Sequence, residues 1–309
     1  MNKYYTKCNI TGNLLLRSPV KIIGGKSRLR NKIYHLIPEN TQCYYEPFLG
    51  SATVLIGAPK FGYETVNDIS PWNINFFKCL QGNPEYLFKW ISHYLEKLKS
   101  GGKETFTWLR SLLKEDDFDS YFNKYEIAAI YYIIDKSCTN GIFRFNQKGL
   151  CNSSYCGTTE GRGWATLEWL KLVQERIKDV WFHQLDYKSF LREYVKRGGV
   201  RNDFIYLDPP YNNVWTQYNK IKFTNEDHSI LFDSIKNLNS NWLLSINDNQ
   251  EVRELYKDFN ILPVLTQWTC ITKAKSNCSV QELFIANYEL NPDKIKVQDA
   301  KRKSSITKV

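Results

Sequence analysis

The chain has 309 residues, a hydrophobic content of 42%, an aromatic content of 15% and a formal net charge of +10 at pH 7. This composition excludes an intrinsically disordered chain and is typical of one large α/β domain, or of one domain with a substantial insertion. The positive charge favours a polyanionic partner, most simply nucleic acid.

A membrane surface is the competing polyanion, but the sequence has no apolar stretch long enough to span a bilayer and no signal peptide. We therefore expect a soluble, cytoplasmic protein that does not bind membranes. None of the eight cysteines forms a Cys-x-x-Cys pair, and no histidine stands at ligand spacing from a cysteine pair. The sequence therefore predicts reduced thiols and no metal site.

The first glycine-containing motif is Gly24-Gly25-Lys26-Ser27. It resembles a fragment of a phosphate-binding loop, but the upstream glycine is missing and no strong strand precedes it. A site for a nucleoside triphosphate is therefore not predicted here.

A second glycine turn follows the predicted strand at residues 43–46. Gly50, Ser51 and Ala52 keep this turn free of bulk, so that a ligand can approach the backbone, and a helix begins directly afterwards. The turn lacks the lysine of a phosphate loop and the further glycines of a dinucleotide fingerprint. A neutral or cationic nucleoside fits it better than a pyrophosphate; a tight turn without a ligand is the alternative.

Short β-rich runs alternate with helical stretches and predict an α/β sheet of seven strands. The runs cover residues 43–46, 64–66, 180–185, 203–207, 242–246, 259–265 and 281–288. Acidic residues stand at or just after the ends of the first five: Glu46, Asp68, Asp186, Asp208 and Asp248. Because ligands bind at the carboxyl ends of strands in open α/β sheets, these acids predict one carboxylate-lined cleft. Asp68 is placed to accept hydrogen bonds from ribose hydroxyls.

About 110 residues separate the second and third strands, far more than a βα crossover needs. Helices are predicted over residues 85–114, with a break at 99–103, and over residues 126–138, which are apolar and expected to be buried. Residues 140–152 alternate around Gln147-Lys148-Gly149 and predict a β-hairpin. It carries Arg144, Asn146, Lys148 and Asn152, side chains suited to phosphates and base edges, although an ordinary solvated hairpin is the alternative.

Asp208-Pro209-Pro210-Tyr211 follows the apolar strand at residues 203–207. Two prolines cannot donate to a sheet ladder, so the strand must end there. A carboxylate, two backbone carbonyls and an aromatic ring are thus fixed together where ligands bind. A flat, donor-rich nucleobase suits these groups; a strand-ending turn with a surface tyrosine is the alternative.

In their order and spacing, these motifs resemble the Dam-type (alpha-class, D12) DNA adenine-N6 methyltransferases. The resemblance covers roughly residues 19–289 and implies a Rossmann-like seven-stranded methyltransferase sheet with an inserted helical plus β-hairpin target-recognition domain. It implies a catalytic domain of residues 18–84 and 178–290 that binds S-adenosylmethionine, and a recognition domain of residues 85–177. Residues 291–309 form a basic tail that we expect to be disordered.

The resemblance also assigns residues. Cofactor-binding residues are expected at Lys26, Glu46, Pro47, Phe48, Gly50, Asp68, Ile69, Asp186, Tyr187 and Asp208. The catalytic residues are expected to be Asp208, Pro209, Pro210 and Tyr211, and the DNA contacts Asn140, Arg144, Asn146 and Lys148. Two departures stand out: Ile22 replaces an aromatic residue that packs on the cofactor, and Ser51 and Ala52 replace glycines. We expect these to alter cofactor affinity without abolishing binding.

The implied reaction transfers a methyl group from S-adenosylmethionine to the N6 amine of an adenine that is flipped out of double-stranded DNA. Hydrogen bonds from the amine to the Asp208 carboxylate and the Pro209 carbonyl would free its lone pair, while Tyr211 stacks on the base. The alternatives are an RNA or protein-amide methyltransferase, a catalytically inactive DNA-binding relative, and a nucleotide-dependent enzyme. The recognition sequence, the oligomeric state and an accompanying restriction endonuclease stay open at this point.

Overall fold

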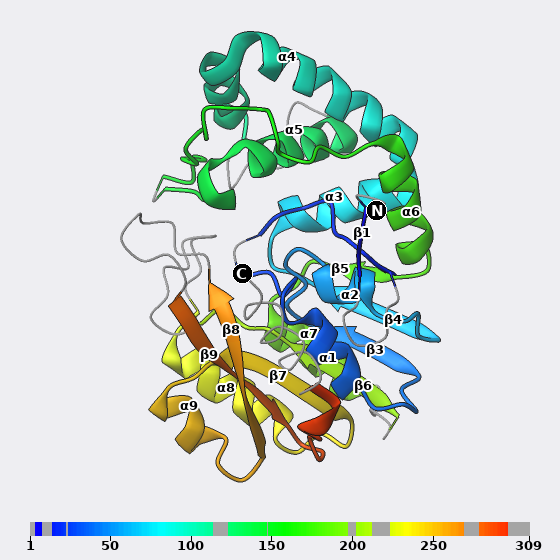
Figure 1. Ribbon diagram of the computed structural model, residues 1–309, viewed down its shortest axis with the longest axis vertical. Coiled ribbons are helices and arrows are strands. Elements are labelled where there is room, and N and C mark those ends of the chain that lie inside the picture. Colours follow the sequence, from blue (N-terminus) through cyan, green and yellow to red (C-terminus); the bar gives the residue numbers. More distant parts are fainter. Residues whose placement is uncertain are drawn as a thin grey trace, which may run out of the picture.

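The computed structural model describes residues 4–7, 14–22, 24–113, 123–146, 148–196, 202–211, 223–268 and 278–295. Its centre is a seven-stranded sheet in the order β5-β4-β3-β6-β7-β9-β8 (Figure 1). The strands are β3 (Cys43–Glu46), β4 (Tyr63–Asn67), β5 (Trp181–His183), β6 (Asp203–Leu207), β7 (Asn241–Asn247), β8 (Asn260–Trp268) and β9 (Cys278–Ala286). All seven predicted strands are confirmed, and with them the Rossmann-like α/β fold.

Strands β3 to β7 are parallel, whereas β9 is antiparallel to its neighbours β7 and β8. The parallel strands β3 and β6 lie at the middle of the sheet, and all five residues of β6 are buried. Burial on both faces explains why β6 is a continuous apolar run instead of an alternating one. Because parallel strands end at the same edge, the residues that follow β3, β4, β5 and β6 are brought together.

Helices cover both faces of the sheet. Phe204 packs in the core with α1 (Arg30–Leu36), α2 (Thr53–Gly57) and α3 (Pro71–Gly82). Ile205, the next residue, packs in a second core with α7 (Tyr187–Lys196), α8 (Asn225–Ile235) and α9 (Gln250–Leu255). This is the two-residue period of a strand with two buried faces. A small hairpin, β1 (Tyr5–Lys7) and β2 (Leu14–Leu16), forms a separate sheet.

The described part of the long insertion between β4 and β5 is mostly helical. It contains α3, α4 (Pro84–Ser111), α5 (Lys124–Ser137) and α6 (Leu167–Ile177), and α4 and α5 lie against each other above the sheet (Figure 1). The predicted break in the first helix is confirmed at Gly102, whose φ of 52° interrupts α4 in a region that glycine tolerates. The predicted burial of the second helix is confirmed as well, since Ile130, Tyr132 and Ile134 are fully buried.

The predicted hairpin at residues 140–152 is only partly present. Its start forms a 3-10 turn, Thr139–Gly141, and an antiparallel bridge joins Phe145 to Cys151, with another between Cys138 and Tyr155 just outside the segment. Phe143 and Phe145 are buried, and their rings contact Tyr131 and Trp72 respectively. Two backbone hydrogen bonds flank the bridge, from the Asn152 N–H to the Arg144 carbonyl at 3.0 Å and from the Asn146 N–H to the Leu150 carbonyl at 2.9 Å, so pairing and packing against the helices together hold this segment. Gln147, at the predicted tip, lies outside the described residues.

The predicted C-terminal tail begins in the described part, where residues 293–295 form a helical turn and Ile295 is buried. Residues 296–309 lie outside the described residues. Five cysteines in the described part, Cys43, Cys79, Cys138, Cys151 and Cys156, are free thiols, as predicted. Among the described residues, no helix combines the length and apolarity needed to cross a membrane.

Candidate active site

A cavity of about 440 Å³ lies at the carboxyl edge of the parallel strands. Its lining comes from the loop before α1, the turn after β3, the end of β4, and the segments after β5 and β6. The lining contains every residue predicted for catalysis or cofactor binding: Lys26, Glu46, Pro47, Phe48, Gly50, Asp68, Ile69, Asp186, Tyr187, Asp208, Pro209, Pro210 and Tyr211. Residues that lie far apart in the chain, from Lys26 to Tyr211, thus meet around one space.

The glycine turn after β3 is fixed by Asp68. One oxygen of this carboxylate accepts the backbone N–H of Gly50 at 2.8 Å, and the other accepts that of Ser70 at 2.8 Å. Gly50 and Ala52 both have positive φ, 49° and 53°, which produces the sharp reversal into α2. The turn and the carboxylate therefore form one rigid unit at the cavity wall.

One departure from the expected pattern, Ile22, lies in the loop before α1, and the other, Ser51 and Ala52, lies in this turn. Ile22 and Ser51 line the cavity, and the Ser51 hydroxyl lies 2.8 Å from the hydroxyl of Thr53. A Cβ on Gly25 would stand 3.1 Å from the Ser51 hydroxyl and 3.1 Å from the Ile22 carbonyl oxygen. Gly25 therefore allows the loop before α1 to lie directly on the glycine turn.

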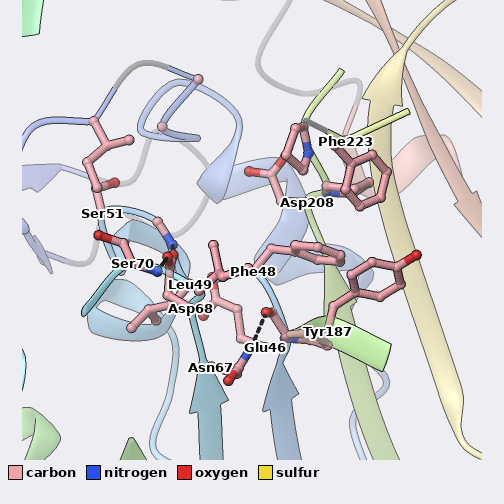
Figure 2. Close-up of a pocket in the computed structure, with 18 of the residues that line it drawn as sticks. Glu46, Phe48, Leu49, Ser51, Asn67, Asp68, Ser70, Tyr187, Asp208 and Phe223 are labelled. Carbon is pink, nitrogen blue, oxygen red and sulfur yellow. Dashed lines mark hydrogen bonds between the residues drawn. The ribbon is translucent and has the colours of Figure 1, made fainter. Parts of the chain in front are cut away.

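Three aromatic rings form one side of the cavity. The centroid of the Phe48 ring lies 5.4 Å from that of Tyr187 and 5.9 Å from that of Phe223, and the last two are 5.3 Å apart. Figure 2 shows these three rings together, with Asp68 and Ser70 across the cavity from them. Asp186 caps α7 by accepting the N–H groups of Lys188 and Ser189. Aromatic faces opposite a hydrogen-bonding carboxylate suit a nucleoside.

Sequence reasoning missed Phe223 and other lining residues. Tyr131 and Phe143 come from the insertion, while Lys188 and Asp227 form an ion pair of 2.9 Å at the cavity. The signal for Phe223 was local: it directly precedes Thr224, which begins α8 with a capping box. A hydrophobic residue at that position packs onto its surroundings and fixes the approach of the chain to the helix.

The motif after β6 is bound to the loop before α1. The Lys26 ammonium donates to Asp208 Oδ1 at 2.6 Å and to the Gly24 carbonyl oxygen at 3.1 Å, and it lies 4.9 Å from the centroid of the Tyr211 ring. Lys26 is only 5% exposed. The structure thus places Lys26, predicted as a cofactor residue, in direct contact with the predicted catalytic residues.

Burial controls the charges in this part of the cavity. It raises the pKa of Asp208 to about 6, although the Lys26 ammonium acts in the opposite direction. Burial would lower the pKa of Lys26, but Asp208, Tyr211 and Glu282 outweigh it and raise that pKa above its ordinary value. Burial also raises the pKa of Glu46 well above its ordinary value, although Glu46 accepts a hydrogen bond from the Tyr44 hydroxyl at 2.8 Å. At pH 7 the Lys26–Asp208 pair is therefore a cation beside an ionised carboxylate.

One predicted cleft residue does not belong to the cavity. Asp248, at the end of β7, binds Arg253 through two hydrogen bonds of 2.6 and 2.8 Å and is not part of the lining. Because β7 lies one strand beyond β6, away from the glycine turn, its end does not reach the cavity. The prediction of five carboxylates around one cleft is wrong at this position.

The four predicted DNA contacts lie in the segment after α5, and Arg144, Asn146 and Lys148 are not part of the cavity lining. Asn140 belongs to the 3-10 turn, Arg144 is half-buried and Lys148 is exposed. The side-chain oxygen of Asn146 accepts the N–H groups of Lys148 and Leu150, so it stabilises the turn. Gly141 and Phe143 of the same segment do line the cavity, so this segment adjoins it.

The sequence of the chain is similar to those of known DNA methyltransferases. Residues 23–270 match the model of the D12 class N6 adenine-specific DNA methyltransferases. A type II methyltransferase of Lactococcus lactis subsp. cremoris is 28% identical over 88% of this chain and 96% of its own length. A type II methyltransferase of Methanocaldococcus jannaschii is 26% identical over 87% of this chain and 98% of its own length. A DNA adenine methylase of Haemophilus influenzae is 23% identical over 90% and 96%, respectively.

Proposed function

Because the chain belongs to the D12 class of N6 adenine-specific DNA methyltransferases, we propose that it uses S-adenosylmethionine to methylate a flipped adenine in duplex DNA. Members of this family are adenine-specific DNA methyltransferases, and the chain is therefore an enzyme of this kind. The observation that carries the proposal is one continuous cavity, lined both by the glycine turn with Asp68 and by Asp208 to Tyr211. The methyl donor and the base that accepts the methyl group can react only if both are bound in one such space.

The part of the cavity near the glycine turn suits the cofactor. Asp68 would hold the ribose of the cofactor, and the rings of Phe48, Tyr187 and Phe223 would enclose the adenine ring of the cofactor. The fit rests on the open backbone of the turn, on the aromatic wall and on the acidic lining. Bound S-adenosylmethionine supplies an electrophilic methyl group, and its positive sulfonium suits a cavity rich in carboxylates.

Asp208 would orient the target amine. At neutral pH its carboxylate is ionised, since its pKa is about 6, and it can accept a hydrogen bond from the amine together with the Pro209 carbonyl. These bonds favour a tetrahedral nitrogen whose lone pair is free, and Tyr211 would stack on the base. Such positioning can lower the barrier by about 7–11 kcal/mol, so no covalent intermediate with the protein is needed.

The segment after α5 would read the DNA. Arg144 suits guanine, Asn140 and Asn146 suit adenine or phosphate, and Lys148 suits a phosphate. In this proposal, residues 18–84 and 178–290 form the catalytic domain and residues 85–177 form the recognition domain. Since two of the relatives are named type II methyltransferases, we also propose a cognate restriction endonuclease as a cellular partner.

Mapping of methylated bases tests the proposal in one experiment. DNA is isolated from cells expressing the protein, and N6-methyladenine is located at single-base resolution. We expect methylation at adenines within one short sequence and none in cells expressing Asp208→Ala. Absence of N6-methyladenine in DNA, with methyl transfer to RNA or to a protein amide instead, would refute it.

A further inference from the structure

Asp135 is a buried carboxyl group that none of the assignments above explains. It lies in the last turn of α5, is fully buried, and one of its oxygens makes no hydrogen bond within the described part of the chain. The other oxygen accepts the backbone N–H of Lys21 at 2.9 Å, across 114 residues of sequence. Burial of a carboxyl group is costly, so the position calls for a reason beyond core packing.

The segment after α5 makes a second contact with Lys21. Gly141 has a φ of 72°, and a Cβ at this position would lie 3.3 Å from the Lys21 carbonyl oxygen. The positive φ and the close approach both favour glycine. Lys21 is thus contacted from two sides: its N–H binds the last turn of α5, and its carbonyl group lies against the turn that follows.

The loop before α1, which contains Lys21, also contacts both parts of the cavity. Gly25 lies against the glycine turn, since a Cβ there would stand 3.1 Å from the Ser51 hydroxyl. Lys26 donates to Asp208 Oδ1 at 2.6 Å. One short loop therefore connects α5 with the glycine turn and with the motif after β6.

The insertion reaches the cavity at the same place. Tyr131, one turn before Asp135 on α5, lines the cavity together with Gly141 and Phe143, and the rings of Tyr131 and Phe143 lie 5.0 Å apart. Gly141 and Phe143 belong to the segment that carries Arg144, the proposed base contact. The loop before α1 and the segment after α5 thus border one cavity and contact each other at Lys21.

We propose that Asp135 is a positioning residue: by binding Lys21 it fixes the loop before α1 on the segment after α5, so that cofactor binding and sequence-specific DNA binding strengthen each other. The inference rests on the proposed function for the identity of the two ligands. A cofactor that orders the loop also orders the segment bound to it, so less conformational entropy is lost when DNA binds. By linkage, DNA must raise the affinity for the cofactor by the same factor.

Calorimetry with S-adenosylhomocysteine, which has no methyl group to transfer, measures this coupling. Its Kd is determined with and without a duplex that contains the mapped site. In the unmodified protein we expect the duplex to lower this Kd by about 5-fold or more. Asp135→Ala removes the acceptor of the Lys21 N–H, so the factor should fall below about 2. Asp135→Asn keeps an acceptor oxygen and should retain most of the coupling.

Two further variants separate this effect from damage to the fold. Asn75→Ala is the matched control, because it also removes a hydrogen bond between a side chain and the backbone of α5, to the Lys124 carbonyl at 2.8 Å, at the opposite end of the helix. Gly141→Ala places a methyl group against the Lys21 carbonyl; it should lose the coupling and serves if Asp135→Ala does not fold. An unmodified protein without coupling, full coupling in Asp135→Ala, or an equal loss in Asn75→Ala would each overturn the proposal.

Hydrogen exchange in the free protein tests the contact without either ligand. The amide of Lys21 should exchange at least about 5-fold faster in Asp135→Ala than in the unmodified protein or in Asp135→Asn. If the unmodified protein neither binds S-adenosylhomocysteine nor methylates DNA but this difference is seen, the proposed function fails and the link between loop and segment stands. Normal methylation of adenine, with equal exchange at Lys21 in all three proteins, refutes the role of Asp135 and leaves the proposed function intact.

Discussion

Substitution of Phe223 by alanine tests the aromatic wall of the cavity. The Phe223 ring lies 5.3 Å from that of Tyr187, 5.9 Å from that of Phe48 and 4.7 Å from that of His228. Removal of a ring that stacks on a base costs about 1–3 kcal/mol, which corresponds to a loss of cofactor affinity of roughly 5- to 150-fold. Because the ring contacts the cofactor equally before and during the reaction, KM for the cofactor should rise with kcat unchanged.

Isothermal titration calorimetry and initial rates at saturating DNA measure this effect. Phe61→Ala is a matched control, since Phe61 also stacks on a tyrosine, Tyr44, at 5.3 Å but does not line the cavity. Its cofactor affinity should stay within about twofold of that of the unmodified protein. An unchanged cofactor affinity in Phe223→Ala, or a lower kcat at saturating cofactor, would refute the proposal that this aromatic wall binds the adenine ring of the cofactor.

Three further predictions concern DNA reading, protonation and the glycine turn. Arg144→Ala should relax sequence preference by about 1–3 kcal/mol, whereas Lys148→Ala should weaken binding to all sequences and reduce the salt slope by about one, both measured by fluorescence anisotropy. Activity should fall as the pH drops below about 6, because protonated Asp208 no longer accepts from the amine; a pH–rate profile without this limb contradicts the assignment. Gly25→Ala should weaken cofactor binding because of its 3.1 Å contacts, and the additional change Ser51→Gly should restore part of it, as calorimetry would show.

The strands and the cavity were predictable because their signals are local. The strand that became β6 is a run of apolar residues that two prolines end, and burial of all its residues matches that pattern. The carboxyl ends of parallel strands then lie at one edge of the sheet, and this does not depend on how individual side chains pack. This is why Asp68, Asp186 and Asp208 could be assigned to one cavity from their positions alone.

The features that the sequence did not predict depend on contacts between segments that are far apart in the chain. No sequence pattern shows that Lys26 binds Asp208, because 182 residues separate them. Asp248 was assigned to the cleft because it ends a strand, but the order of the strands places it near Arg253 instead. The alternation in residues 140–152 predicted a ladder; in the described part of this segment the backbone pairing gathers around Phe145 and Cys151, while Phe143 and Phe145 are buried against the helices.

The central claim is that Asp208 activates an adenine amine, and methyl transfer to duplex DNA tests it most directly. A tritiated methyl group is followed from S-adenosylmethionine into a duplex containing the mapped site, with Asp248→Ala as the control carboxylate outside the cavity. The unmodified protein and Asp248→Ala should label adenine N6, while Asp208→Ala should lose turnover by about 10³-fold or more and still bind the duplex. Retained turnover in Asp208→Ala, or label on another base, would contradict the account.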